Sequence, residues 1–305
     1  MEKFLVAGKF NPIESWKKSV AIVRPRVESS IDSSNLNFEQ RKVLNHVKNQ
    51  LRLSESEQKS NPLRLICFGA AGTGKSVVIK AIIDEIENQK FTKPELEYHV
   101  MAYTATAANE VNGDTIHSSF GLNQFHYNLY DKANTLNTEK EQRLQRKTLQ
   151  RLNPILWLLI DEASHLGLEM FGYGDKICRF SDPPNSDKPF GGKNVLLFCD
   201  LFQLPPVADL PLFSDEAKFD REEQCEAKAT YNSFTTIVFL QQSIRQQSKH
   251  FSDLLNRVAR KVPTTRDLSV LNRRRLSCLS EEEKSTFSDA IYICSTNKEV
   301  DDWNR

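Results

Sequence analysis

The sequence predicts an α/β fold in which helices cover both faces of a parallel β-sheet. Five short apolar runs, at residues 63–68, 98–103, 154–160, 194–199 and 236–240, are separated by stretches with helical spacing. Most of these runs are almost continuously hydrophobic, as expected for parallel strands that are covered on both faces. A glycine-rich loop directly after the first run supports the same prediction. Strands that alternate with helices in this way indicate a doubly wound domain.

The helices are predicted from the spacing of apolar residues around these runs. The first follows a candidate cap at Asn35 or Asn37, and its apolar side chains fall near one face: Phe38, Val43, Leu44, Val47 and Leu51. Helical spacing also occurs at residues 76–88 and 140–152. Residues 181–193 are rich in proline and glycine, which predicts a loop before the fourth strand.

The pattern along the chain indicates a tail, one complete domain and the beginning of another. Residues 1–36 lack sustained periodicity, and residues 37–240 carry the alternating strands and helices. Within residues 241–305 the pattern starts again, with a helix predicted at 251–259 and a buried strand at 290–294. We therefore expect a second α/β domain that has only begun by the last residue.

The composition is ordinary for a soluble globular protein. Of 305 residues, 39% are hydrophobic and 27% are charged. The net charge of +1 provides no overall basic field, so any contact with nucleic acid must come from local patches. The six cysteines form no Cys-x-x-Cys pair, which argues against zinc and favours reduced thiols. No apolar stretch is long enough to cross a membrane, and we expect an intracellular protein.

Residues 69–76 read GAAGTGKS, a complete phosphate-binding loop between a strand and a helix. Glycine is required where backbone N–H groups turn inward around a phosphate chain. Lys75 is expected to contact the β- and γ-phosphates, and the Ser76 hydroxyl is expected to bind Mg²⁺. The motif therefore predicts a site for a triphosphate with Mg²⁺, formed by Gly69, Ala70, Ala71, Gly72, Thr73, Gly74, Lys75 and Ser76.

Two carboxylates end the apolar run of PILWLLIDEAS. Asp161 is expected to contact Mg²⁺, directly or through another ligand of the metal, opposite Ser76 and from a strand that neighbours the phosphate loop. Glu162 can orient the attacking water or accept its proton. Acidic residues at the carboxyl end of a strand match the usual position of ligands in open α/β sheets.

Two further side chains are candidates for contact with the γ-phosphate. Gln203 follows the strand in NVLLFCDLFQLPPV, and its amide can hydrogen-bond the phosphate or the attacking water. The alternative is a loop glutamine that bonds only to backbone. Arg245 in LQQSIRQQ can neutralise charge that develops on the transferred phosphoryl group. The alternative is an ordinary surface arginine.

Together these segments resemble Pif-type helicases, RecD-like members of helicase superfamily 1 that include the helicases of Helitron transposons. The motifs follow the family order: NLNFEQRKVLNHV, GAAGTGKS, TATAANEVNGDTIHSSFGL, LLIDEAS, PFGGKNVLLFCDLFQLPPV, LQQSIRQQ and FSDLLNRVAR. The resemblance covers residues 37–304, and PFGG, TIHS and FQLPPV are not general ATPase motifs. One departure is Cys199, which stands where the family usually has glycine.

The resemblance implies a RecA-like fold, ATP with Mg²⁺, and movement 5′ to 3′ on single-stranded DNA with unwinding at duplex junctions. It implies that Gln40 contacts adenine and that Thr104, Thr106 and His117 line the DNA path. By itself, a histidine such as His117 is more often a hydrogen-bonded core or surface residue without a ligand. The family's tasks include DNA repair, recombination, telomere maintenance and transposition, which are compatible with a nuclear or mitochondrial location.

Residues 121–152 are a candidate wedge or DNA-facing insertion. An aromatic cluster begins at Phe120, on which bases can stack, and continues with Phe125, His126, Tyr127 and Tyr130. The stretch KEQRLQRKTLQR that follows has five positive residues and one negative residue. A wedge or DNA-facing helix and a solvated helix with an aromatic core face explain this stretch equally well.

The late motifs of the family, including a second arginine for the γ-phosphate, would lie beyond Arg305 in the remainder of a second motor domain. One hypothesis is therefore an ATP-dependent helicase represented by its first motor domain, for which we expect at most slow hydrolysis. The second is a fragment that binds ATP and DNA without useful turnover. A nucleotide kinase is disfavoured, because it would not need TIHS or FQLPPV.

Overall fold

The computed structural model describes residues 33–122, 139–215, 218–219, 221–246, 248–288, 290–291 and 293–304. The chain divides into two compact units, residues 1–245 and residues 246–305, called the first unit and the second unit below. The aromatic cluster predicted after Phe120 lies outside the described residues at Phe125, His126, Tyr127 and Tyr130.

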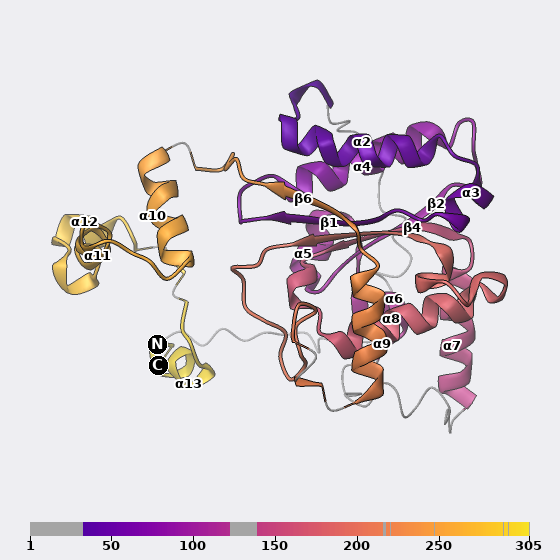
Figure 1. Cartoon of the computed structure of the whole chain (residues 1–305). Helices are drawn as coiled ribbons and strands as arrows, with labels where there is room; N and C mark the ends of the chain where they lie inside the picture. The colour runs from indigo at the N-terminus through magenta and orange to yellow at the C-terminus, as the bar shows by residue number, and fades with distance from the viewer. Residues whose placement is uncertain are drawn as a thin grey trace, which may run out of the picture. The chain divides into compact units, whose positions relative to one another are not determined.

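A parallel sheet forms the centre of the first unit, with its strands in the order β3-β2-β4-β5-β1-β6 (Figure 1). The strands are β1 (Arg64–Gly69), β2 (Glu97–Ala102), β3 (Asp114–Thr115), β4 (Ile155–Asp161), β5 (Asn194–Cys199) and β6 (Thr236–Leu240). The five predicted strands are confirmed, each with ends within one residue of the prediction. The two-residue edge strand β3 was not predicted.

Helices cover both faces of this sheet, which confirms the predicted fold class. Helices α2 (Phe38–Leu51) and α4 (Lys75–Gln89) lie on one face, and α8 (Leu168–Ser181) and α9 (Glu222–Asn232) lie on the other (Figure 1). The first unit also contains α3 (Glu55–Ser60), α5 (Ala105–Glu110), α6 (Ile116–Phe120), α7 (Glu139–Leu152) and the 3₁₀ turns Ser33–Asn35, Ala163–His165, Pro183–Asn185 and Pro189–Gly192. Asn37 caps α2, and its side chain accepts a hydrogen bond from Gln40 N.

The core consists of two apolar layers, one on each face of the sheet. In β1, Leu65 and Cys67 pack in the layer under α2 and α4, whereas Ile66 packs in the layer under α8. Successive side chains of a strand point to opposite faces, so a strand that is covered on both faces is buried at every position. This arrangement explains why β4 is buried along its whole length, and why its sequence is continuously apolar rather than alternating.

The PFGG motif belongs to the amino end of the sheet, opposite the end where the phosphate loop begins. Phe190 N donates to Asp175 Oδ1, and the Arg64 guanidinium donates to the carbonyl oxygens of Pro189 and Lys193. Arg64 opens β1 and Lys193 directly precedes β5. The motif therefore fixes the amino ends of these two paired strands.

The second unit consists of short helices in the part of it that the structure describes. These are α10 (Lys249–Ala259), α11 (Thr265–Asn272), α12 (Glu281–Ser285), α13 (Asn297–Trp303) and the 3₁₀ turn Leu276–Cys278. A double hydrogen bond from Arg257 to Asp267 joins α10 to α11 at 2.8 Å. The buried strand predicted at 290–294 is wrong, because Ile291 and Ile293 are 92% and 96% exposed. An isolated strand needs a neighbour to pair its backbone groups, and none of the described residues of this unit forms one.

Within the described ranges, no helix combines the length and the apolar character that a membrane-spanning segment requires.

Candidate functional site: a phosphate loop and paired carboxylates

The loop between β1 and α4 has the backbone of a phosphate cradle. Gly72 and Gly74 both have φ of +85°, a left-handed conformation that favours glycine. Gly74 also begins α4, and no side chain caps this end of the helix. The first amide groups of a helix are its unsatisfied donors and the positive end of its dipole. These residues therefore fit an anionic ligand such as a triphosphate.

Lys75 lies against the loop that would surround the phosphates. Its ammonium group donates to Gly69 O at 2.6 Å and lies 3.5 Å from Ala70 O. Thr73 closes the turn by donating from its backbone N and from Oγ1 to Ala70 O, at 3.2 and 2.8 Å. Ser76 follows on the first turn of α4 and is half-buried. Lys75 and Ser76, one predicted phosphate ligand and one predicted magnesium ligand, are therefore together at the amino end of this helix.

Gln40 lies directly against the phosphate loop and is only 1% exposed. Its Nε2 donates to Thr73 O at 3.1 Å, and its Oε1 accepts from Asn37 N at 3.0 Å. The first bond connects the beginning of α2 to the loop, and the second is half of the cap of α2. In this structure Gln40 therefore supports the loop backbone.

We expect Gly74→Ala to weaken nucleotide binding by roughly tenfold or more, about 1.4 kcal/mol. A β-carbon at Gly74 would lie 2.4 Å from Gln40 Nε2, in a backbone conformation that alanine rarely adopts. Left-handed residues other than glycine cost about 1 to 3 kcal/mol. Titration with a fluorescent ATP analogue measures the affinity, and thermal unfolding measures the stability.

Gly121→Ala is the matched control for this variant. Gly121 also has a left-handed φ, of +69°, and a β-carbon there would lie 2.6 Å from Thr148 Oγ1. We expect a similar loss of stability but unchanged nucleotide affinity, because Gly121 lies outside the loop. Equal affinities for Gly74→Ala and the unmodified chain would show that the loop does not hold the nucleotide.

The segment after β6 is bound to the phosphate loop, as its predicted role requires. Ile244 N and Arg245 N donate to Gly72 O at 2.8 and 3.2 Å. A β-carbon on Gly72 would lie 2.8 Å from Cβ of Arg245, so only glycine allows this approach. The Arg245 side chain is exposed beside the loop.

Asp161 ends β4, but the expectation that its strand neighbours the phosphate loop is wrong. Strand β5 lies between β4 and β1. Adjacent strands are about 4.8 Å apart, so the ends of β4 and β1 are roughly 10 Å apart. This gap is wide enough for a metal ion and a phosphate group between the carboxylate and the loop.

The electrostatics of Asp161 nevertheless connect it to the loop. The residue is 5% exposed, and this burial raises the pKa of its carboxyl group to about 6. Two effects lower the pKa: Glu162 N donates to Asp161 Oδ1 at 2.9 Å, and the positive charge of Lys75 favours the ionised carboxylate. Lys75 is therefore within electrostatic reach of the carboxylate.

Glu162 and Gln203 are held by neighbours in the turn that follows β4. Glu162 has a left-handed φ of +54°, and its Oε2 lies 3.2 Å from His165 Nε2. The Ser164 hydroxyl donates to Gln203 Oε1 at 3.1 Å. The structure therefore brings Gln203 to the turn that carries Glu162. Sequence reasoning did not identify His165, although it lies three residues after Glu162.

The candidate DNA-binding residues lie around the carboxyl end of β2. Thr104 and Thr106 are exposed at the beginning of α5, where Thr104 Oγ1 accepts from Ala107 N at 3.2 Å. His117 on α6 is half-buried, and its ring contacts Tyr103 edge-on at a centroid distance of 5.8 Å. Burial lowers the pKa of His117. Because Tyr103 directly precedes Thr104, the contact brings His117 and the two threonines to the same strand end.

Phe120 has no exposed ring on which a base could stack. It is 3% exposed and belongs to the core layer under α8. Gly174 on α8 leaves space for the Phe120 ring, because a β-carbon on Gly174 would lie 2.7 Å from Cε2 of that ring. The stacking role expected for Phe120 is therefore wrong in this structure.

Helix α7 has features of both interpretations of its basic sequence. Thr148 and Leu152 are buried, and Arg151 donates to the carbonyl oxygens of Ser118 and Ser119 at the end of α6. Arg143 and Arg146, in contrast, are exposed. The helix therefore packs on the first unit by one face and presents cations on another.

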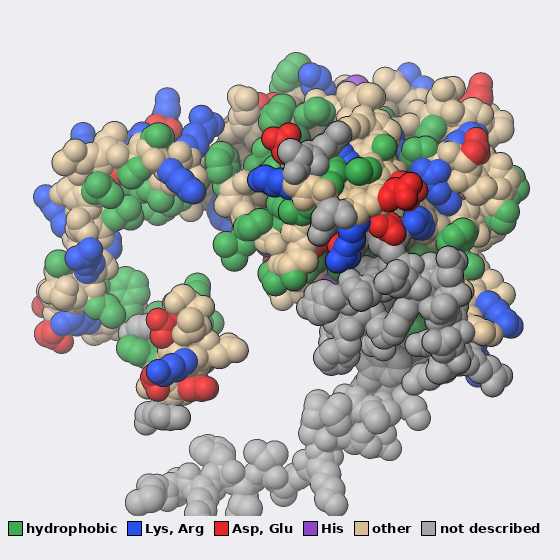
Figure 2. Space-filling view, turned by 60° about the horizontal axis from the view of Figure 1, so that its bottom comes forward, with side chains coloured by type: hydrophobic (Ala, Val, Ile, Leu, Met, Phe, Trp, Pro, Cys, Tyr) green, Lys and Arg blue, Asp and Glu red, His purple; other side chains and the backbone are tan. Residues whose placement is uncertain are grey.

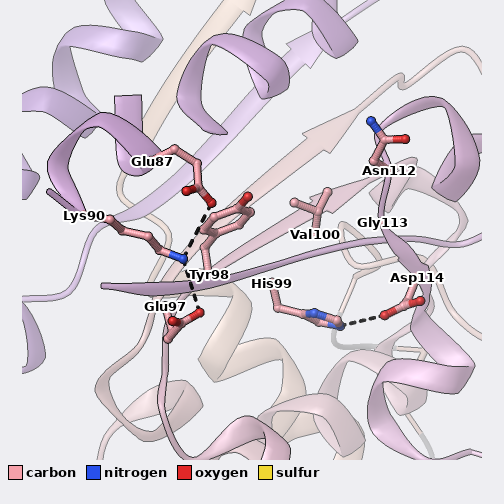
Figure 3. A pocket seen from close by; sticks show the side chains of 9 residues that line it. All are labelled: Glu87, Lys90, Glu97, Tyr98, His99, Val100, Asn112, Gly113 and Asp114. Carbon is pink, nitrogen blue, oxygen red and sulfur yellow. Dashed lines mark hydrogen bonds and ion pairs between the residues drawn. The ribbon is translucent and has the colours of Figure 1, made fainter. Parts of the chain in front are cut away.

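A pocket of about 260 Å³ lies elsewhere, between the carboxyl-terminal end of α4 and the edge of the sheet (Figure 3). It is roughly 18 Å along α4 from the phosphate loop, at 1.5 Å per residue. Its Lys90 pairs with Glu87 and Glu97 at 3.6 and 3.4 Å, and the His99 ring lies 3.8 Å from the Asp114 carboxylate. Burial lowers the pKa of His99 to about 4, so its ring is neutral at pH 7. The pocket is separate from the candidate site.

The sheet, the loop and the carboxylates define a P-loop protein of the RecA-like class. The chain belongs to the PIF1-like helicase family, whose model matches residues 35–262.

Curated relatives agree with this assignment. The ATP-dependent DNA helicase PIF1 of Emericella nidulans is 30% identical over 241 residues, a match that covers 77% of this chain and 29% of the relative. The ATP-dependent DNA helicase PIF1 of Saccharomyces cerevisiae is 30% identical over 253 residues, covering 79% and 27%. The chain thus spans less than a third of the length of these relatives.

Solved structures show the same fold. The Pif1 helicase from Candida albicans superposes with a TM-score of 0.62 at 25% identity, over 88% of this chain and 53% of that one. Bacteroides Pif1 in complex with ADP-AlF3 and single-stranded DNA superposes with a TM-score of 0.57 at 26% identity, over 88% and 56%.

Proposed function

We propose that this chain is the first motor portion of an ATP-dependent DNA helicase that moves 5′ to 3′ on single-stranded DNA and opens duplex junctions. In this proposal residues 37–240 form a RecA-like ATPase domain, and residues 241–305 begin a second one. The observation that carries the proposal is the uncapped amino end of α4 beside a loop of left-handed glycines. The relatives' names support it, as does the solved complex of Bacteroides Pif1 with ADP-AlF3 and single-stranded DNA.

Each group at the proposed site has a chemical role. Lys75 and the loop amides bind the phosphates, and the second hydrogen of the Gln40 amide is a donor for adenine. Ser76 and Asp161 would hold Mg²⁺, which neutralises phosphate charge when bound. Glu162 orients the attacking water and accepts its proton. Gln203 contacts the γ-phosphate, and Arg245 neutralises charge on the transferred group.

Single-stranded DNA is proposed to cross the carboxyl end of β2 at Thr104, Thr106 and His117. On the face drawn in Figure 2, Lys and Arg side chains are interspersed with Asp and Glu rather than gathered together. Because the net charge of +1 provides no overall basic field, a local patch must supply the grip, and the exposed arginines of α7 are our candidates.

The experiment measures single-stranded DNA binding across a range of salt concentrations, and ATP hydrolysis with and without that DNA. Each phosphate contact with single-stranded DNA contributes about 0.7 to the slope of log affinity against log salt. We expect Arg143→Gln combined with Arg146→Gln to reduce this slope by about 1.4. The control pair, Arg41→Gln with Lys42→Gln, removes two exposed cations from α2 and should leave the slope unchanged.

We expect slow hydrolysis that single-stranded DNA accelerates. Binding of nucleotide and DNA without any hydrolysis would favour the alternative, a fragment without useful turnover. Failure to bind a nucleotide at all would refute the proposed function.

A further inference from the structure

We propose that His165 is the positioning residue for Glu162, and that Tyr103 holds the His165 ring in place. The inference rests on the proposed function, in which Glu162 orients the attacking water. His165 belongs neither to the phosphate loop nor to the residues that would hold the metal.

The local backbone brings the two side chains together. Glu162 precedes the 3₁₀ turn Ala163–His165, and His165 N donates to Glu162 O at 3.0 Å. A 3₁₀ turn has three residues per turn, so positions three apart are eclipsed. The left-handed φ of Glu162 starts this turn immediately at the end of the strand. His165 Nε2 then lies 3.2 Å from Glu162 Oε2, close enough for a ring N–H to donate to the carboxylate.

The register of the sheet places Tyr103 against the other side of the His165 ring. Strands β2 and β4 pair Ala102 with Asp161, so Tyr103 and Glu162 are the next residues on two adjacent strands. The rings of Tyr103 and His165 are 5.5 Å apart between centroids, at an interplanar angle of 31°. Aromatic pairs in this range attract each other and restrict rotation of the ring. The imidazole is therefore confined between Tyr103 and the Glu162 carboxylate.

This arrangement has a consequence for the proposed reaction. Both side chains are only partly exposed, 26% for Glu162 and 21% for His165, which strengthens their interaction relative to a surface pair. A hydrogen bond to one carboxylate oxygen fixes the plane of the carboxylate and leaves the other oxygen for a water molecule. A displacement of a reacting group by about 1 Å can lower the reaction rate by ~100-fold.

The test uses the full 305-residue chain, single-turnover hydrolysis and binding of a non-hydrolysable ATP analogue. His165→Phe keeps a ring beside Tyr103 but removes the donor, and we expect a rate lower by roughly 10- to 100-fold with unchanged analogue affinity. His165→Gln restores a donor at similar reach and should recover most of the rate. In a Glu162→Gln background, His165→Phe should cause no further loss, because the two residues act through one interaction.

A normal rate for His165→Phe, or an equal loss with and without Glu162, would overturn the positioning role. The hydrogen bond is checked separately, without nucleotide, by the ¹⁵N chemical shift of His165 Nε2. We expect this shift to change in Glu162→Gln and to stay constant in Glu85→Gln, a control on α4. If the ¹⁵N shift is the same in Glu162→Gln as in the unmodified chain, the inference is refuted. If the hydrogen bond between His165 and Glu162 is present but the chain binds no nucleotide, only the proposed function is refuted.

Discussion

Replacing Lys75 with methionine is expected to reduce ATP hydrolysis by roughly 10² to 10³-fold, because removal of a single electrostatic stabiliser in a preorganised site has a cost of this size. Lys75 provides both phosphate binding and charge neutralisation in the proposed site. Its ammonium group already lies 2.6 Å from Gly69 O, at the start of the cradle. Methionine keeps an apolar stem of similar length and removes the charge together with its hydrogen-bond donors. Phosphate release in the presence of single-stranded DNA is the measurement.

Lys80→Met is the matched control, since Lys80 lies on the same helix and is also half-buried. We expect that variant to hydrolyse ATP normally and both variants to unfold at similar temperatures. Hydrolysis by Lys75→Met at the rate of the control would show that the phosphate loop is not the site of the chemistry.

The sequence predicted the central strands because they are covered on both faces. Every residue of β4 is buried, so its composition alone identifies a strand between helices. The phosphate loop was equally predictable, because its glycines meet a geometric requirement that the structure shows directly at Gly72 and Gly74. Both predictions depend on local constraints.

The errors arose where distant parts of the chain determine the result. The position of Asp161 two strands from β1 depends on strand order, which the crossovers set and apolar spacing does not reveal. The burial of Phe120 depends on the space left by Gly174, on another helix. The position of the His165 ring between Glu162 and Tyr103 requires a left-handed residue and the register of β2 against β4. The three-residue spacing was visible, but alone it is a weak signal.

Replacing Asp161 with asparagine is expected to stabilise the fold at neutral pH and to lower hydrolysis at least ~100-fold. Burial raises the pKa of Asp161 to about 6, above its ordinary value of 3.8. In the absence of ligand, the folded state therefore favours the protonated acid. This stabilising contribution is complete below pH 4 and is lost as the pH rises through 6. At pH 7.5 the ionised group costs on the order of 3 kcal/mol, at 1.36 kcal/mol per pKa unit.

Asparagine removes this cost because it does not ionise, and its Oδ1 can still accept the hydrogen bond from Glu162 N. For a domain of this size, each kcal/mol shifts the melting temperature by about 2 to 4 °C. The new amide hydrogens need partners in a buried site, so we expect a gain of about 5 °C at pH 7.5 and no gain at pH 4. Asp215→Asn, an exposed control, should change stability by less than about 0.5 kcal/mol at either pH.

Loss of hydrolysis and gain of stability have the same cause in this variant. A carboxylate that is costly to bury in the free protein is a strong ligand for Mg²⁺, because the metal restores the favourable interactions that the charge lost on burial. Functional groups are commonly retained at such a cost in stability. Calorimetry at the two pH values, together with magnesium-dependent hydrolysis, tests both halves. A variant that is less stable than the unmodified chain at pH 7.5 would contradict the buried ionised carboxylate, and one that retains hydrolysis would contradict its role in holding the metal.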